Sequence, residues 1–231
     1  MAVHKISPEL LTLDRVDEIL KKGLKIELSE ESKSRILKCR EYLDNKMETQ
    51  KEPIYGITTG FGSLCNISIS KEQLSQLQKN LVMSHACGVG EEVPQEIVKI
   101  MLLNKIQSLS YGNSGVQLQT VERLIEFFNN DIFPVVYQQG SLGASGDLAP
   151  LAHMCLPLLG LGVVDYKGER ISGEELNKRF SWQPIELQSK EGLALLNGTQ
   201  FMSSFAVWCI IKAQKLSALA DKIMAVSLEA F

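Results

Sequence analysis

Three small residues in a row, Ala144, Ser145 and Gly146, lie in the stretch QGSLGASGDLAPLAHM at positions 139–154. These residue types in this order can close a ring, because the amide nitrogen of Gly146 can attack the carbonyl carbon of Ala144. Loss of water from the ring, and of the Ser145 hydroxyl as a second water, would leave an exocyclic methylidene. Glycine supplies an unhindered nitrogen and a flexible backbone for this closure. The product is an electrophile that no ordinary side chain provides, so it would act as a built-in cofactor.

Other interpretations of Ser145 compete with ring formation. A hydrolase nucleophile needs G-x-S-x-G, whereas in GASGD the second glycine comes one place early, and His153 follows too soon to be the base. A phosphate-binding loop is excluded because no G-K-[ST] follows the glycines. A plain turn, with Asp147 as the N-cap of a helix that starts at Leu148, stays open from the local sequence.

Helical patterns surround the ring-forming stretch and predict a mainly α fold. Amphipathic helices are expected over 95–109 and 116–130, and an apolar helix over 148–160, closed near Gly160. No glycine or proline follows Gly198, and apolar residues keep helical spacing to the last residue without a stop signal. The sequence therefore predicts a long final helix and a chain that is a fragment of a longer protein.

Shorter elements are expected before and after these helices. Apolar and charged residues alternate over 24–28, which predicts a strand, and Ser29 is a candidate cap for the helix that follows. A helix is expected to begin near Ser70 and to carry an apolar row that continues to His85. The segment 162–172 predicts a hairpin that turns at Lys-Gly.

Composition excludes several classes of function. With 24 basic and 27 acidic residues the net charge is −3, so nucleic acid is not an expected partner. The five cysteines and three histidines are dispersed without a C-x-x-C pair, which argues against a disulfide framework or a metal site. The N-terminus lacks an apolar signal region and the late apolar run over 205–211 is too short for a membrane span. We expect a cytoplasmic protein without a membrane partner.

Five motifs in order resemble the aromatic amino acid ammonia-lyases and aminomutases, a family that forms the ring 4-methylideneimidazole-5-one (MIO). They are YGITTGFG (55–62), NLVMSHACGVG (80–90), LSYGNSGV (109–116), GSLGASGDLAPLAHM (140–154) and KEGLALLNGTQ (190–200). The resemblance covers most of the chain. It implies a mainly α MIO-bearing domain over 1–198 with a few short strands, and the beginning of a central bundle of long helices over 199–231.

The resemblance also implies roles for named residues. Ala144, Ser145 and Gly146 would form MIO without an external cofactor, and Asn197 would hold the ring oxygen or the substrate amine. Tyr55 would be the base that removes the substrate β-proton. Without the resemblance, Tyr55 could be a packed aromatic and Asn197 a turn residue, because Asn-Gly is a strong turn signal.

Two further residues belong to the substrate side of the resemblance. His85 would hydrogen-bond a substrate imidazole, and its alternative is a core histidine, since it continues an apolar helix face. Gly62 would lie at the substrate and act, with Gly60, as a hinge of the Tyr55 loop.

The pair Ser84-His85 is typical of the histidine-specific members of the family. The resemblance therefore implies elimination of ammonia from L-histidine to give trans-urocanate, and a homotetramer for the full-length protein. The family arginine that grips the substrate carboxylate lies in the later part of family chains, so the fragment alone is expected to be inactive. Two alternatives remain: a tyrosine ammonia-lyase or aminomutase, and an inert truncated module without a mature ring.

Overall fold

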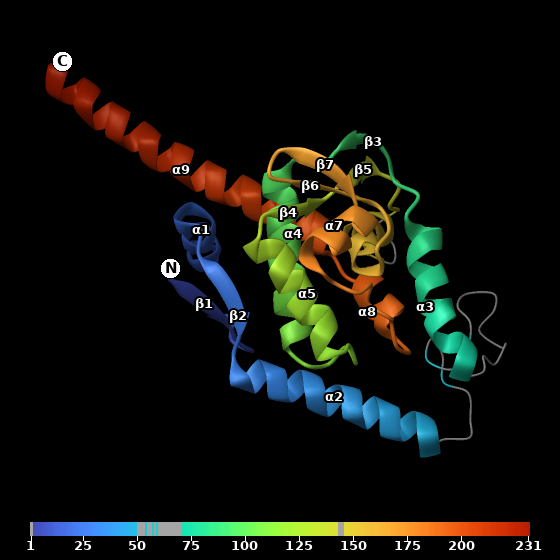
Figure 1. Ribbon diagram of the computed structural model, residues 1–231. Helices are drawn as coiled ribbons and strands as arrows, with labels where there is room; N and C mark the ends of the chain where they lie inside the picture. The colour runs from blue at the N-terminus through green and yellow to red at the C-terminus, as the bar shows by residue number, and fades with distance from the viewer. Residues whose placement is uncertain (1, 50–53, 55–56, 58, 60–70, 143–145) are drawn as a thin grey trace.

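The computed structural model describes residues 2–49, 54, 57, 59, 71–142 and 146–231, and this part is mainly helical (Figure 1). Its helices are α1 (Leu13–Lys22), α2 (Glu30–Thr49), α3 (Lys71–His85), α4 (Gln95–Ser110), α5 (Leu118–Asn129), α6 (Leu148–Cys155), the 3₁₀ helix η2 (Leu156–Leu159), α7 (Gly173–Phe180), α8 (Glu191–Leu196) and α9 (Gln200–Ala230). Its strands are β1 (Val3–Ile6), β2 (Lys25–Leu28), β3 (Val89–Glu92), β4 (Ile132–Pro134), β5 (Tyr137–Gln139), β6 (Val163–Tyr166) and β7 (Glu169–Ser172). The prediction of a mainly α chain with a few short strands is confirmed.

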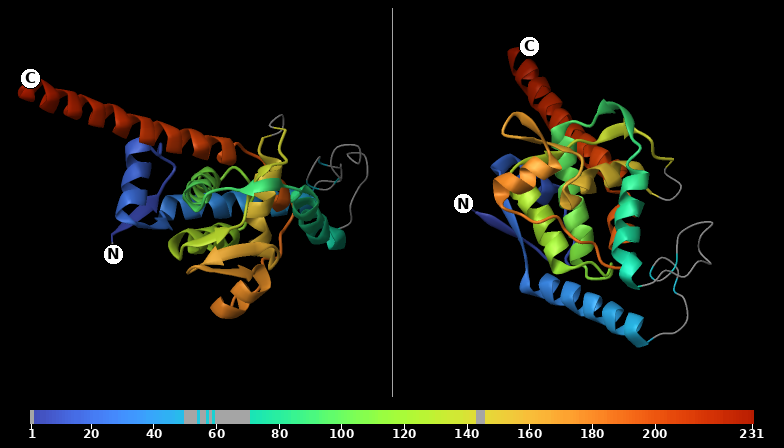
Figure 2. Two further views of the ribbon diagram at one scale, coloured as in Figure 1. Left: turned by 90° about the horizontal axis from the view of Figure 1, so that it is seen from above. Right: turned by 45° about the vertical axis from the view of Figure 1, so that its right-hand side comes forward.

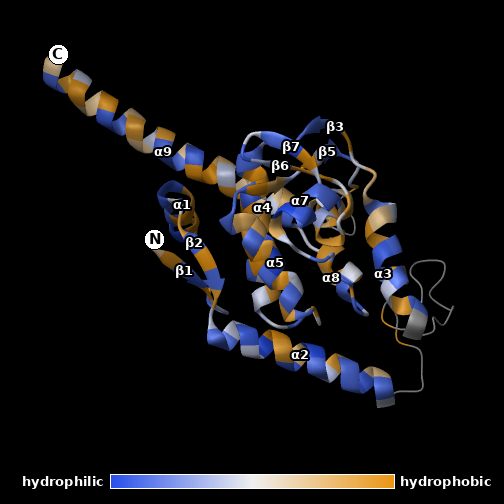
Figure 3. Cartoon of the chain, viewed as in Figure 1, coloured by the Kyte–Doolittle hydropathy of each residue, from blue (hydrophilic) through white to orange (hydrophobic). Residues whose placement is uncertain are grey.

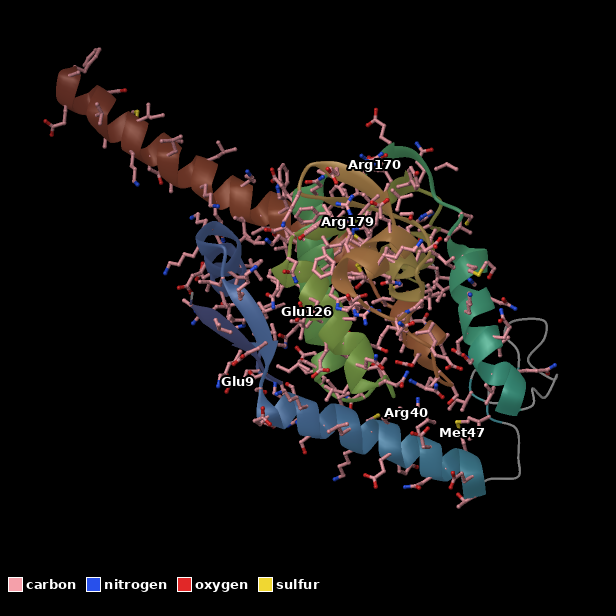
Figure 4. The ribbon with its side chains drawn as sticks, in the orientation of Figure 1. Glu9, Arg40, Met47, Glu126, Arg170 and Arg179 are labelled. Carbon is pink, nitrogen blue, oxygen red and sulfur yellow. The ribbon has the colours of Figure 1, made fainter. Side chains whose placement is uncertain are left out.

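Helix α4 lies at the centre of the core, between α5, α9 and α2. The helix predicted over 95–109 is confirmed, but its predicted amphipathic character is wrong. Because other elements surround α4, its buried residues occur on every side, and they include the polar Lys105 and Gln107. Helix α5 does keep an exposed polar face, which carries Glu122. Glu126, on the same face, is labelled in Figure 4.

The N-terminal strands β1 and β2 form a parallel pair, with α1 as the connection between them. The predicted strand over 24–28 is confirmed, although its partner was not predicted. The side chain of Asn129, at the end of α5, completes the pairing of β2: its Oδ1 accepts from Ile26 N at 2.8 Å and its Nδ2 donates to Ile26 O at 2.9 Å.

Helix α2 lies along the outside of the fold and is tied to the segment before α8. As predicted, Ser29 caps this helix, and its Oγ accepts from Ser32 N at 3.1 Å. Farther along α2, Arg40 and Met47 reach the connection that leads into α8 (Figure 4). Arg40 Nη1 donates to Ser189 O at 2.9 Å, and Ser189 Oγ donates to Met47 Sδ.

Two small antiparallel sheets complete the body of the fold. Strands β6 and β7 form the predicted hairpin and β4 joins beside β6. The turn residues Lys167 and Gly168 have φ of +52° and +81°, as a type I′ turn requires. Strand β3 pairs with β5, which brings the chain just after His85 beside the chain that leads to Gly146.

Helix α6 ends in η2 at Gly160, where the apolar helix was predicted to close. Helix α9 begins inside the body, where it packs against α4, and then projects from it (Figures 1 and 2). Its projecting part alternates polar residues with exposed apolar ones (Figure 3), namely Leu216, Leu219, Ile223, Met224, Val226 and Leu228. The long final helix is therefore confirmed.

In the described part of the chain, the stretch Glu191–Ala230, which comprises α8, the short turn after it and α9, is apolar and long enough to cross a membrane by length and composition. Its most apolar window has a mean hydropathy of 1.3. The expectation of no membrane span was based only on the apolar run over 205–211, which ends before Lys212. The stretch is longer because α9 continues through Lys212 without interruption, with its first part in contact with α4.

Candidate active site

Gly146 is the member of the ring-forming triplet that the structure describes, and it lies directly against Gly198. Its φ is +92°, a conformation that residues with a side chain rarely adopt. A Cβ added to Gly146 would overlap Gly198 O and would lie 3.1 Å from Gly198 C and 3.2 Å from Gly198 N. The carbonyl oxygen of Gly146 accepts from Ser141 Oγ at 3.0 Å. Only glycine fits this position, while Ala144 and Ser145 lie outside the described residues.

Asp147 attaches the ring-forming stretch to the start of α9. Its backbone N donates to Gly198 O at 2.9 Å, and its carboxylate Oδ2 accepts from Met202 N at 3.0 Å. Asp147 does stand directly before α6, but its side chain makes no capping bond to that helix, so the alternative of a side-chain cap is wrong. The buried carboxylate instead satisfies a free N–H in the first turn of α9, where the helix dipole favours a negative charge.

The predicted turn at Asn197 and Gly198 connects α8 to α9. Asn197 N donates to Leu193 O at 3.0 Å and so closes α8, and Gly198 follows with φ of +135°. The Asn197 side chain is exposed, on the turn against which Gly146 lies. The turn interpretation and the site interpretation of Asn197 are thus compatible, and the structure brings two distant motifs together here.

Lys105, which the sequence analysis missed, reaches this turn from inside α4. Its Nζ donates to Asn197 O at 2.8 Å, although the residue is only 1% exposed. Burial lowers the pKa of Lys105 to about 8, and burial raises the pKa of the neighbouring Cys155 thiol in α6 to about 12. The one available sequence signal was a lysine within the apolar run IMLLNKI.

His85 is the last residue of α3, and it is only partly buried. Its Nδ1 lies 2.8 Å from Leu81 O, to which it can only donate, so in the neutral ring Nε2 is left as an acceptor. His85 is therefore not a core histidine, because its side chain is only partly buried. The position leaves His85 able to accept a hydrogen bond from a ligand.

Helix α3, which carries His85, packs against α6 and α8, the helices that follow Gly146 and precede Asn197. One direct link is the hydrogen bond of 2.9 Å from Gly192 N to Gln78 Oε1. After α3, the chain is fixed by His153 of α6, whose Nε2 accepts from Gly88 N at 2.9 Å. Since that nitrogen must be unprotonated to accept, burial favours the bond by lowering the pKa of His153.

Glu191 supports the start of α8 with a fully buried carboxylate, another residue that the sequence analysis did not single out. The residue is 0% exposed and accepts from Gln117 N and Gln188 N, each at 2.8 Å, and from Thr120 Oγ1 at 2.7 Å. Gln117 Nε2 donates a further bond of 2.6 Å. These donors replace the water that the carboxylate loses on burial.

Tyr55 and Gly62, together with Gly60, lie outside the described residues. Of the predicted site residues that are described, the structure places Gly146 against the turn that carries Asn197, and His85 on a helix packed against the neighbouring elements. Within the described residues, no group of three or more His, Cys, Asp and Glu side chains is arranged to hold a metal ion.

Residues 11–231 match the family model described as aromatic amino acid lyase. The chain belongs to this family. It is 47% identical over 220 residues to a histidine ammonia-lyase of Caldanaerobacter subterraneus, covering 95% of this chain and 43% of that protein. It is 45% identical over 228 residues to histidine ammonia-lyase 2 of Fusobacterium nucleatum, covering 99% of this chain and 44% of that protein. The chain thus spans less than half the length of these curated relatives.

Solved structures of the family share the fold. The histidine ammonia-lyase from Trypanosoma cruzi has a TM-score of 0.86 and 35% identity, over 96% of this chain and 43% of that one. A tyrosine aminomutase from Streptomyces globisporus has a TM-score of 0.82 and 33% identity, over 90% of this chain and 38% of that one. The family and the fold predicted from the five motifs are confirmed.

Proposed function

We propose that the chain is the N-terminal part of a histidine ammonia-lyase, a carbon–nitrogen lyase that eliminates ammonia from L-histidine to give trans-urocanate. The observation that carries this proposal is the identity of 47% to a curated histidine ammonia-lyase over 95% of the chain. The geometry agrees with this chemistry, since Gly146 lies against the turn that carries Asn197.

The electrophile in this proposal is the MIO ring made from Ala144, Ser145 and Gly146, with no external cofactor. The described residues fit such a ring: Gly146 has the backbone conformation and the lack of side chain that its contact with Gly198 requires. The ring would supply a methylidene carbon that bonds the substrate amine and so makes nitrogen a better leaving group. Ser141 and Asp147 hold the stretch beside it in place.

Three residues act on the substrate in this proposal. His85 Nε2 accepts a hydrogen bond from the substrate imidazole N–H, because Nδ1 is already engaged by Leu81 O. Asn197 is exposed on the turn against which Gly146 lies, and its carboxamide would hold the ring oxygen or the substrate amine. Tyr55, with Gly62 in its loop, removes the β-proton.

The whole protein is proposed to be a cytoplasmic homotetramer, in which residues 199–231 begin a central helix bundle and residues 1–198 form the ring-bearing domain. The exposed apolar residues of α9 support this arrangement, because a helix with such a surface needs partners to cover it (Figure 3). The substrate carboxylate would be bound by residues that the rest of the protein contributes.

The test uses the full-length protein that contains this chain. It is incubated separately with L-histidine, L-tyrosine and L-phenylalanine, and product is followed by ultraviolet absorbance. Urocanate from histidine alone is the expected result. Product from tyrosine and none from histidine would instead establish the alternative, a tyrosine lyase or aminomutase. The likeness to the tyrosine aminomutase structure is the observation that supports this alternative.

A further inference from the structure

Lys105 is a buried cation without a described carboxylate partner. It occupies the middle of the central helix α4, where a methionine or leucine would be easier to bury, because an ammonium group loses its hydration there. None of the ion pairs in the described part of the chain includes it. Its hydrogen bond goes to one backbone atom, Asn197 O, at 2.8 Å.

Two consecutive carbonyls of the turn are held from different elements. Lys105 of α4 binds the oxygen of Asn197, while Asp147 N, at the start of α6, binds the oxygen of Gly198 at 2.9 Å. The residue before Lys105 adds a third attachment, since Asn104 Nδ2 donates to Ser204 Oγ of α9 at 3.0 Å. The turn therefore has little freedom to move relative to α4 or α6.

The held peptide is also the surface that Gly146 touches. The peptide bond whose oxygen binds Lys105 carries the nitrogen of Gly198, which lies 3.2 Å from the place of a Cβ on Gly146. A cationic donor on a peptide oxygen draws electron density from that peptide and makes its N–H a stronger donor. Lys105 thus affects both the position and the polarity of the peptide that lies against the end of the ring-forming triplet.

We propose that Lys105 is a positioning residue for ring formation, which fixes and polarises the Asn197–Gly198 peptide against which Gly146, the source of the attacking nitrogen, is held. This inference rests on the proposed function, because it presupposes that the ring forms. In the step concerned, the Gly146 nitrogen bonds to the Ala144 carbonyl carbon. The Ala144 oxygen leaves as water with the proton of Gly146 N and the proton of Ser145 N, and a C=N bond forms between Ala144 C and Ser145 N. The Ser145 hydroxyl leaves with the Ser145 α-hydrogen as the second water, so no oxidant or reductant is needed.

The experiment compares Lys105→Met and Lys105→Arg with the wild type in the full-length protein. Intact mass gives the fraction of chains that have lost two waters over time, and hydrogen exchange followed by mass spectrometry reports the Asp147 amide, which donates to Gly198 O. Lys190→Met is the matched control, because Lys190 Nζ also donates to a backbone carbonyl, Ser114 O at 2.6 Å, and burial also lowers its pKa.

In Lys105→Met we expect ring formation to be slower by about tenfold or more, as the loss of a charge-assisted hydrogen bond implies, and exchange at Asp147 to be faster. Lys105→Arg should restore both in part, and Lys190→Met should leave both unchanged. If Lys105→Met does not fold, Lys105→Gln replaces it with the same expected direction.

Wild-type ring formation and wild-type exchange in Lys105→Met would overturn the inference. An equal loss in Lys190→Met would also overturn it, since the effect would then belong to any buried lysine. A wild-type protein that forms no ring contradicts the proposed function instead. In that event exchange at Asp147 alone decides whether Lys105 holds the turn.

Discussion

The carboxylate of Asp147 accepts a hydrogen bond of 3.0 Å from Met202 N, so the residue that follows the ring-forming triplet caps α9 and not α6. The two residues are far apart in sequence, and their bond joins the ring-forming stretch to the helix that projects from the body. Asp147 N adds a second link to the same connection through Gly198 O. The start of α9 is thereby tied to the residue next to Gly146.

Replacement of Asp147 by alanine should destabilise the protein by about 1–2 kcal/mol, the usual cost of losing a helix cap, and should slow ring formation. Asp147→Asn keeps an oxygen that can accept from Met202 N, so it should lose less stability. The free energy of unfolding from urea titration and the intact mass are the two measurements. An Asp147→Ala variant as stable as the wild type would show that the cap is not needed.

Gly146→Ala should destabilise the fold more than Gly168→Ala and should abolish the ring. Both glycines have positive φ, +92° and +81°, so both variants suffer backbone strain of about 1–2 kcal/mol. Only at Gly146 does a Cβ also overlap the oxygen of Gly198, whereas at Gly168 it meets nothing within 4 Å. Chemical denaturation of both variants measures the difference, and equal losses would contradict the close contact.

The elements that the sequence predicted well are those determined by neighbouring residues. The long helix α9 follows from the absence of glycine and proline after Gly198, and the hairpin from the Lys167-Gly168 turn. The parallel partner of β2 was not predictable, because the pairing is completed by Asn129, a residue from α5 that no local pattern connects with Ile26. Likewise, the burial of α4 on every side was not predictable. It depends on which elements surround the helix, and that is a tertiary property.

The residues of the candidate site divide in the same way, into those indicated by local sequence and those whose contacts depend on the tertiary fold. Gly146 and Asn197 were predicted as site residues from their residue types and motifs, and the structure places Gly146 against the turn that carries Asn197. For Asp147 the local sequence left a side-chain cap of α6 open as one alternative, but its carboxylate binds Met202 N, a donor of α9 that no local capping rule includes. Lys105 was missed because a single lysine in an apolar helix does not indicate which group it binds, here the carbonyl oxygen of Asn197.

Acidification should weaken the fold through His153. Its pKa is lowered from the ordinary 6.5 by burial, so the folded state binds the proton less well than the unfolded state does. The contribution of His153 is therefore complete above pH 6.5 and is lost as the pH falls through its lowered folded value. His4, whose pKa burial also lowers, adds a slope of the same sign.

The measurement is the free energy of unfolding against pH from pH 7 down to about pH 5, in the wild type and in His153→Gln. Glutamine keeps an acceptor for Gly88 N but does not titrate, so the variant should show a shallower loss, with the His4 part remaining. Identical slopes in the two proteins would contradict the role of His153.

Replacement of Glu191 by glutamine should cost about 2–4 kcal/mol, because a buried carboxylate that accepts from Gln117 N, Thr120 Oγ1 and Gln188 N would become an amide with one oxygen. The new NH₂ group would face a backbone donor. Glu174→Gln is the matched control, since it removes an exposed ion pair with Lys178 on α7 and should change stability little. Thermal unfolding of both variants measures the contrast. A Glu191→Gln variant as stable as Glu174→Gln would mean that the start of α8, and with it the turn against Gly146, does not depend on this carboxylate.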